Sequence, residues 1–94
     1  MIVTVTLQRW TGGEANWAYV VVPAEASDDI RVHAFENPRG FRSVRVECSV
    51  GDVTWRTSLF PRKDGGYFLP IKAEVRRRAR LAVGDEVRLS LRLL

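Results

Sequence analysis

The chain has very few of the residues that build metal centres, disulfides or redox sites. Its 94 residues contain one cysteine, Cys48, and one histidine, His33. A zinc site needs about three or four such ligands and a disulfide needs two cysteines, so the sequence predicts no metal site, no disulfide and no cofactor. A lone thiol is typical of a reducing compartment, and we expect the protein in the cytoplasm. Cys48 falls on the apolar side of an alternating segment, which favours a buried, unreactive side chain.

Groups of side chains that could carry out catalysis are missing as well. His33 is the one histidine available as a base for any serine, the carboxylates are scattered, and no glycine-rich phosphate-binding loop is present. The sequence therefore favours a protein without enzymatic activity. An enzyme that holds an anionic substrate with Arg76 stays open as a weaker alternative, for which the sequence offers no catalytic group.

Long hydrophobic runs are also absent. The longest apolar stretch, from Trp17 to Ala24, includes a proline and is far shorter than the roughly 20 residues that cross a bilayer. The first residues alternate between apolar side chains and threonine, unlike the basic and then apolar segments of a signal peptide. We therefore expect neither a membrane partner nor a cleaved leader.

The composition is that of an ordinary globular domain with a basic surface. The chain is 46% hydrophobic and 28% charged, a balance that supports one core and predicts a single domain over residues 1–94. The net charge of +4 favours polyanionic partners, although a small excess of this kind is also common without one. The sequence leaves the oligomeric state at monomer or weak homodimer.

Alternating apolar and polar residues predict about six strands and two short helices. The first helix is expected between Ala24 and Phe35 with Ser27 as its N-cap, and the second over Lys72–Leu81. The predicted strands are Ile2–Arg9, Trp17–Pro23, Val44–Val50, Val53–Leu59, Tyr67–Ile71 and Glu86–Leu94. Six strands around one core favour an all-β fold, a closed or nearly closed barrel, because closure removes unpaired sheet edges.

Several local features sharpen this prediction. Trp17–Pro23 is apolar on both faces, which predicts a central strand covered on both sides. Turns are expected at Thr11-Gly12-Gly13, at Gly51-Asp52 and at Gly84-Asp85, where Asp85 should cap backbone amides. In the second helix, the inward stripe is predicted to be Val75, Ala79 and Ala82.

A faint internal repeat indicates that the chain has two related halves. Val22-Pro23-Ala24-Glu25 with Arg31 resembles Ile71-Lys72-Ala73-Glu74 with Arg80, and each copy precedes a strongly alternating strand. The identities are few, but they favour two strand-helix-strand halves around a pseudo-twofold axis.

In order and spacing, these segments resemble a bacterial family of domains of unknown function, the one numbered nineteen hundred and five. The pattern is a Trp-led strand ending in Pro, a hairpin ending in Ser-Leu-x-Pro, a Gly-rich turn, a Leu-Pro strand, a Val-Arg helix start and a Gly-Asp-x-Val strand. The sequence matches it at Trp17, Pro23, Ser58, Leu59, Pro61, Gly66, Leu69, Pro70, Val75, Arg76, Gly84, Asp85 and Val87. The resemblance implies a small double-split β-barrel, similar to the AbrB-like swapped-hairpin regulators and antitoxins, and implies no catalytic residues.

The first candidate site is a pocket for an anionic small molecule near Arg76. Arg76 matches the family pattern and is a natural polar anchor for an anion, with Trp55 and Tyr67 as the nearest candidate aromatic partners. The wider aromatic set consists of Trp10, Trp17, Tyr19, Trp55, Tyr67 and Phe68. Core filling is the competing interpretation of these rings, because aromatic side chains on the strands of a small barrel mostly pack inside it.

The second candidate is a nucleic-acid interface on the basic helix and the turn before it. Its residues are Arg62, Lys63, Arg76, Arg77, Arg78 and Arg80. Lysine and arginine in such a cluster can neutralise phosphates, but a solvated helix face that complements the helix dipole explains the same residues. We therefore expect a binding or accessory module, centred on the segment from Tyr67 to Arg80, with nucleic-acid binding as the alternative.

Overall fold

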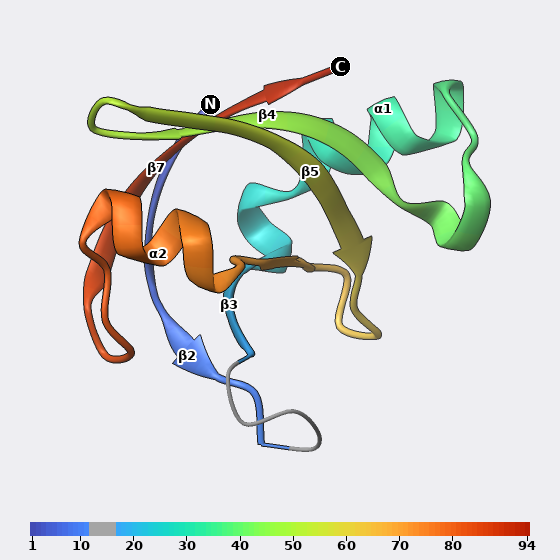
Figure 1. The fold of residues 1–94 in the computed structure, drawn as a ribbon. Coiled ribbons are helices and arrows are strands. Elements are labelled where there is room, and N and C mark those ends of the chain that lie inside the picture. Colours follow the sequence, from blue (N-terminus) through green and yellow to red (C-terminus); the bar gives the residue numbers. More distant parts are fainter. Residues whose placement is uncertain (12–16) are drawn as a thin grey trace.

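The computed structural model describes residues 1–11 and 17–94, with Phe41 described only in its backbone. Of the predicted turn Thr11-Gly12-Gly13, the two glycines lie outside the described residues. The elements in chain order are β1 (Ile2–Thr6), β2 (Gln8–Arg9), β3 (Ala18–Val22), the 3-10 helix η1 (Ala24–Ala26), α1 (Asp28–Glu36), the 3-10 helix η2 (Gly40–Arg42), β4 (Val44–Val50), β5 (Val53–Pro61), β6 (Tyr67–Pro70), α2 (Ala73–Ala79) and β7 (Glu86–Leu93) (Figure 1).

The strands form one antiparallel sheet that rolls into a nearly closed barrel. Their order is β1-β7-β4-β5-β6-β3-β2, and its two end members, β1 and β2, are consecutive in the chain. The two α-helices flank the rolled sheet from different sides (Figure 1). The predicted all-β class with two short helices and a nearly closed barrel is therefore confirmed.

The strand number rises from the predicted six to seven because the first strand bends at Leu7. Up to Thr6 the chain pairs with β7, whereas Gln8 pairs with Tyr19 on β3. Between them, the Leu7 amide donates to the carbonyl of Asp85 and its carbonyl accepts from the amide of Gly84, at 2.9 and 2.8 Å. Because of the bend, residues 2–9 supply the strands at both ends of the sheet order, β1 and β2. The bend also buries the Leu7 side chain.

The core is built from the inward-facing residues of every long strand. Alternation along β4 and β7 buries one side of each strand, as predicted, and Cys48 is fully buried among these residues. Full burial of one valine, leucine or isoleucine side chain contributes about 1.5–3 kcal/mol to stability. The fully buried aliphatic residues are Leu7, Val20, Val22, Ile30, Val44, Val46, Leu59, Leu69, Ile71, Val75, Val87 and Leu89.

Strand pairing repeats between the two parts of the chain. β3 pairs with β6 and β4 pairs with β7, both antiparallel, so each strand of the first part meets its counterpart in the second. The residues that lead into the two helical segments also share one backbone conformation, with φ −67° and ψ 160° at Pro23 and φ −68° and ψ 157° at Lys72. This pairing has the pattern that two equivalent halves would give.

Two details of the predicted packing are wrong. β3 is not covered on both sides: Ala18, Val20 and Val22 are buried, but Tyr19 is half-buried and Trp17 is 55% exposed. Aromatic side chains from the neighbouring strands β5 and β6 share that outer face.

The inward stripe of the second helix is also shorter than predicted. Val75 is buried and Ala79 half-buried, but Ala82 is exposed, because α2 ends at Ala79 and Arg80 adopts a left-handed conformation with φ 57°. Leu81 packs against the core in place of Ala82. The predicted cap at the following turn is confirmed, since an Asp85 carboxylate oxygen accepts from the Ala82 amide at 2.8 Å.

Ser27 is the N-cap residue of α1, as predicted, but its hydroxyl donates hydrogen bonds and does not accept one from a helical amide. The acceptors are the carbonyls of Pro23, at 2.7 Å, and Val22, at 3.3 Å. The buried hydroxyl thus satisfies carbonyls at the end of β3, and Asp28 and Asp29 supply the favourable charge in the first turn of the helix.

Candidate functional site

The first predicted site is spread over two environments. Trp55 is 9% exposed and Tyr67 4% exposed, and both belong to the core cluster. Arg76 is half-buried on α2. The rings of Trp55 and Tyr67 therefore fill the barrel interior, and a role of Arg76 in binding an anion stays a prediction.

The outer face of β3, β6 and β5 carries a groove lined with aromatic side chains, which we call the aromatic groove. Strand register explains it: Tyr19 lies opposite Pro70 on β6, and Phe68 lies opposite Phe60 on β5. Directly opposed residues project from the same face of a sheet. The groove has a volume of about 660 Å³, and its main lining residues are Trp10, Trp17, Tyr19, Phe60, Phe68, Pro70 and Lys72.

The rings of the groove hold one another in place. Trp10 packs edge-on against Tyr19, with ring centroids 5.5 Å apart, and Phe60 stacks on Phe68 at 5.4 Å. Trp10 also lies 6.3 Å from Trp17. Ring pairs at these distances attract one another beyond simple area burial. The result is a preformed aromatic surface that water reaches, most of all at Trp17.

A second hollow continues from the aromatic groove to the turn between β5 and β6. It shares Trp10, Tyr19 and Phe68 with the groove and adds Pro61, Arg62, Lys63 and Asp64. We call residues 62–66 the basic turn. Two cations thus lie beside the rings in this hollow, and Lys72 lies at the groove itself.

The basic turn is closed by its own hydrogen bonds. The Arg62 amide donates to the carbonyl of Gly66 at 2.8 Å, and an Asp64 carboxylate oxygen accepts from the Gly66 amide at 2.9 Å. The Gly66 amide and the charge of Arg62 hold the pKa of Asp64 below its ordinary value. Asp64 is therefore ionised at neutral pH and engaged within the turn.

A third hollow, the arginine hollow, lies on the other side of the basic turn. Pro61 and Arg62 line both the second and the third hollow. The arginine hollow is lined by four arginines, Arg31, Arg39, Arg42 and Arg62, together with Phe35 and Pro38. Phe35, at the end of α1, is 88% exposed.

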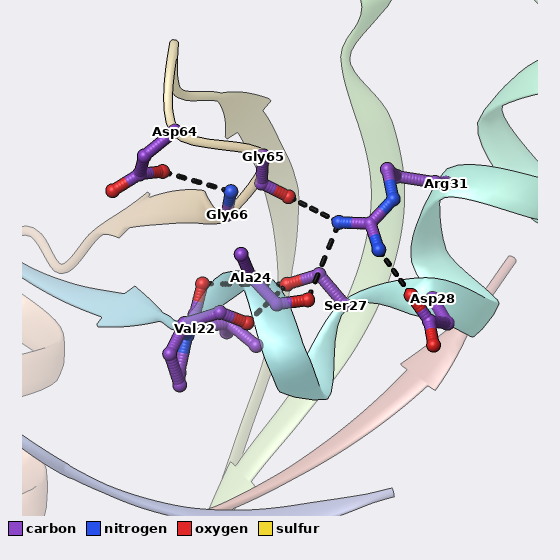
Figure 2. Close-up of polar contacts among 9 residues, drawn as sticks. Val22, Ala24, Ser27, Asp28, Arg31, Asp64, Gly65 and Gly66 are labelled. Atoms are coloured by element: carbon purple, nitrogen blue, oxygen red, sulfur yellow. Dashed lines mark hydrogen bonds and ion pairs between the residues drawn. The ribbon is translucent and has the colours of Figure 1, made fainter.

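Arg31 connects α1 to the basic turn. Its guanidinium donates to the carbonyls of Gly65 and Ala24 and pairs with Asp28 (Figure 2). Gly66 brings the turn close to the end of β3, because a Cβ at this position would lie 2.6 Å from the carbonyl oxygen of Val22. The turn between the two hollows is therefore fixed from both sides.

The residues predicted to bind nucleic acid fall into two groups. Arg62 and Lys63 lie in the basic turn beside the aromatic groove, whereas the other four lie at the C-terminal end of α2. There Arg76 is half-buried, and Arg77, Arg78 and Arg80 are exposed. Cations near a helix C-terminus also complement the helix dipole, so the α2 arginines have a structural role available to them.

The reactive groups of the described residues lie away from these hollows. Burial, with a smaller contribution from the charge of Glu47, raises the pKa of Cys48 to about 12, so its thiol is protonated at neutral pH. The Nε2 atom of His33 lies 2.9 Å from the carbonyl oxygen of Leu94. Within residues 1–11 and 17–94, no three His, Cys, Asp or Glu side chains form a group that could hold a metal ion. What the hollows offer is aromatic surface and positive charge.

Sequence reasoning found part of this surface. Trp10, Trp17, Tyr19 and Phe68 were candidate pocket residues and Arg62 was a candidate nucleic-acid contact. The residues that were missed are Phe60, Pro70, Arg31, Arg39 and Arg42. The available signal is parity: Phe60 and Phe68 fall on the outward positions of their strands, where a large apolar side chain is unexpected in a barrel wall.

The fold and these hollows define a small antiparallel β-barrel with an aromatic and basic outer surface. Residues 4–91 match the family described as Domain of unknown function (DUF1905), and the chain belongs to this family. The predicted family is thereby confirmed, whereas the bacterial origin and the similarity to AbrB-like barrels stay predictions. No curated protein matches the chain. In the part of the chain that the structure describes, no helix has the length and apolarity needed to span a bilayer.

Proposed function

We propose that this protein is a non-enzymatic binding module whose ligand lies in the aromatic groove. The ligand has a planar ring that stacks on the exposed aromatic side chains and a negative charge that lies near lysine or arginine, as in a nucleotide. The observation that carries the proposal is the five-ring surface of Trp10, Trp17, Tyr19, Phe60 and Phe68, with cations beside it.

Stacking gives this surface enough energy to bind such a ligand. A base that stacks on an aromatic side chain contributes about 1–3 kcal/mol, with little preference among bases. Lys72 at the groove and Lys63 in the adjoining hollow are both exposed, and either can approach a phosphate. Arg76 follows Lys72 by one helical turn, which keeps the predicted anionic-ligand residue close to the same surface.

The charge balance of the groove favours an anion over a neutral sugar. Asp64 is the one carboxylate among the described residues that line the first two hollows, and it is held by the Gly66 amide and by Arg62. Binding without chemistry also agrees with the protonated thiol of Cys48 and with the scattered carboxylates of the chain.

Tryptophan fluorescence tests the proposal, because Trp10 and Trp17 line the groove and Trp55 does not. We expect AMP to quench the emission and to raise the melting temperature, and adenosine to bind more weakly because it lacks the phosphate. Trp17→Ala should reduce the quenching and Lys63→Ala should weaken AMP but not adenosine. Arg88→Ala, an exposed cation on β7 away from the groove residues, is the matched control. If AMP, GMP, UMP and CMP at about 1 mM neither quench nor stabilise the protein, the proposal fails.

A further inference from the structure

We propose that the ligand is a single strand of nucleic acid that runs from the aromatic groove, across the basic turn, into the arginine hollow. The inference rests on the proposed function and extends it from one nucleotide to several. Its structural basis is the basic turn itself, because Pro61 and Arg62 line the hollows on both of its sides. One strand can therefore contact both hollows and pass Arg62 between them.

The arginine hollow provides what a phosphate backbone needs. None of the described residues that line it is acidic, whereas four are arginines. Arg31 is tied to Asp28 and to two carbonyls, so it mainly fixes the wall of the hollow. Arg39 and Arg42 are exposed on the loop after α1, where their guanidinium groups can approach phosphate oxygens.

Aromatic surface at both ends of this path favours bases as the groups that accompany the phosphates. The aromatic groove supplies one stacking surface, and Phe35, which lines the arginine hollow, supplies another. Guanidinium planes add stacking positions of their own. An acidic peptide would match the charge of the arginine hollow but would gain much less from the row of rings in the groove.

The exposed ring faces favour a single strand over a duplex. In a duplex the base faces are stacked on one another, so a flat aromatic surface cannot reach them, whereas the bases of a single strand are free to stack on side chains. The molecule has principal extents of 34 × 30 × 23 Å. On a face of this size the protein would contact about four to eight nucleotides of the strand, which is within the range for small single-strand-binding barrels.

The fixed position of the basic turn gives the path a defined shape. Arg31 holds the turn through the Gly65 carbonyl, and the close approach of Gly66 to Val22 leaves no room for a side chain (Figure 2). Arg62 is therefore presented from a turn held by α1 and β3, so the strand does not have to order this turn when it binds.

Anisotropy of fluorescein-labelled oligothymidylates of increasing length tests the inference. We expect affinity to rise from the mononucleotide to about six nucleotides and then to level off. Affinity should fall with salt, with a log–log slope of about −0.7 for each phosphate contacted. Duplex DNA and polyglutamate should compete weakly. If an octamer binds no tighter than the mononucleotide, or if duplex DNA or polyglutamate competes as well as the unlabelled octamer, the inference is overturned, and in the first case the proposed function survives.

Matched variants separate the two hollows and the basic helix. Arg39→Gln with Arg42→Asn should weaken the octamer about tenfold and leave the mononucleotide unchanged, whereas Trp17→Ala should weaken both. Asparagine is chosen because Arg42 has a positive φ of 55°, which asparagine tolerates. Arg77→Ala with Arg78→Ala should reduce octamer binding by less than the first pair. If the α2 pair has the larger effect, the strand lies on the basic helix and the path proposed here is wrong.

Discussion

The guanidinium of Arg31 on α1 donates a hydrogen bond to the backbone carbonyl of Gly65, 34 residues later in the chain. The same side chain reaches the carbonyl of Ala24 and pairs with Asp28. One residue thus joins η1, the first α-helix and the basic turn, and the wall between the second and third hollows depends on it.

Removing this connection should destabilise the protein modestly and loosen the basic turn. We expect Arg31→Ala to lower the free energy of unfolding by about 1 kcal/mol, because the lost hydrogen bonds are partly exposed to water. Arg31→Lys should recover only part of this, since an ammonium group cannot match the fork of a guanidinium. Urea unfolding measures both, with the exposed Arg39→Ala as the control. Equal stability of Arg31→Ala and Arg39→Ala would contradict the prediction.

Among the five glycines that the structure describes, Gly66 has the least room for a side chain. An added Cβ would lie 2.6 Å from the carbonyl oxygen of Val22 and 3.2 Å from the amide nitrogen of Ala24, and both are backbone atoms that cannot rotate away. We expect Gly66→Ala to cost about 1–3 kcal/mol of unfolding free energy, measured by thermal or urea denaturation. Gly40→Ala is the matched control, since nothing lies within 4 Å of a Cβ there. A Gly66→Ala protein as stable as Gly40→Ala would rule out this close approach.

Cys48 should react with thiol reagents only when the protein unfolds. Cys48 lies on β4, and its side chain is fully buried in the core. Burial also raises the pKa of the thiol to about 12, so both access and thiolate are lacking at neutral pH. With Ellman's reagent at pH 8 we expect slow modification of the folded protein and rapid modification in urea. Glutathione under the same conditions provides the reference rate. A folded protein that reacts as fast as glutathione would contradict the burial of this residue.

Acid should remove a contribution that Glu47 makes to stability. The hydrogen bond from Arg92, then that from Arg56, lowers the pKa of Glu47 from its ordinary value of 4.5 in spite of some desolvation. Because the folded pKa is the lower one, the contribution is fully present above the unfolded pKa and is lost as the pH falls through the folded pKa. Wild type should therefore be more stable than Glu47→Gln at pH 7, and the difference should shrink below about pH 4.5.

Urea unfolding over this pH range gives the measurement. Asp64, whose pKa is lowered mainly by the Gly66 amide, adds a similar acid-sensitive contribution in both proteins and therefore cancels in the comparison. A difference between wild type and Glu47→Gln that stays constant from pH 7 to pH 3 would show that the two arginines do not stabilise the ionised carboxylate.

The fold could be predicted from the sequence because most strands bury one face. The alternation of Val44, Val46 and Cys48 and that of Val87, Leu89 and Leu91 correctly gave the inward residues of β4 and β7. The bend at Leu7 could not be predicted, because it depends on hydrogen bonds to the Gly84-Asp85 turn, far away in the sequence. The end of α2 was missed because Arg80 takes the left-handed position that glycine usually occupies.

The sequence predicted which types of residue form the candidate site better than it predicted where they lie in the fold. Aromatic residues and cations were recognised, but the sequence could not show that Phe60, Phe68 and Tyr19 come from three neighbouring strands and face outward together. Trp55 and Tyr67 are aromatic as well, and they differ from these residues only in that their positions on β5 and β6 face the core. The arginine hollow needs residues of the loop after α1 and of the basic turn to line the same hollow, although they are far apart in the sequence, and local patterns do not encode this.

The position of β7 has a consequence for how the chain can fold as it is synthesised. β7 is the last strand of the barrel in sequence, yet it lies between β1 and β4 and pairs with both. Until β7 has left the ribosome, β1 and β4 each carry an open edge, and non-local pairings of this kind form slowly. A nascent chain arrested after α2 should therefore remain sensitive to protease and prone to self-association, and completion of one final strand should convert it to the closed form.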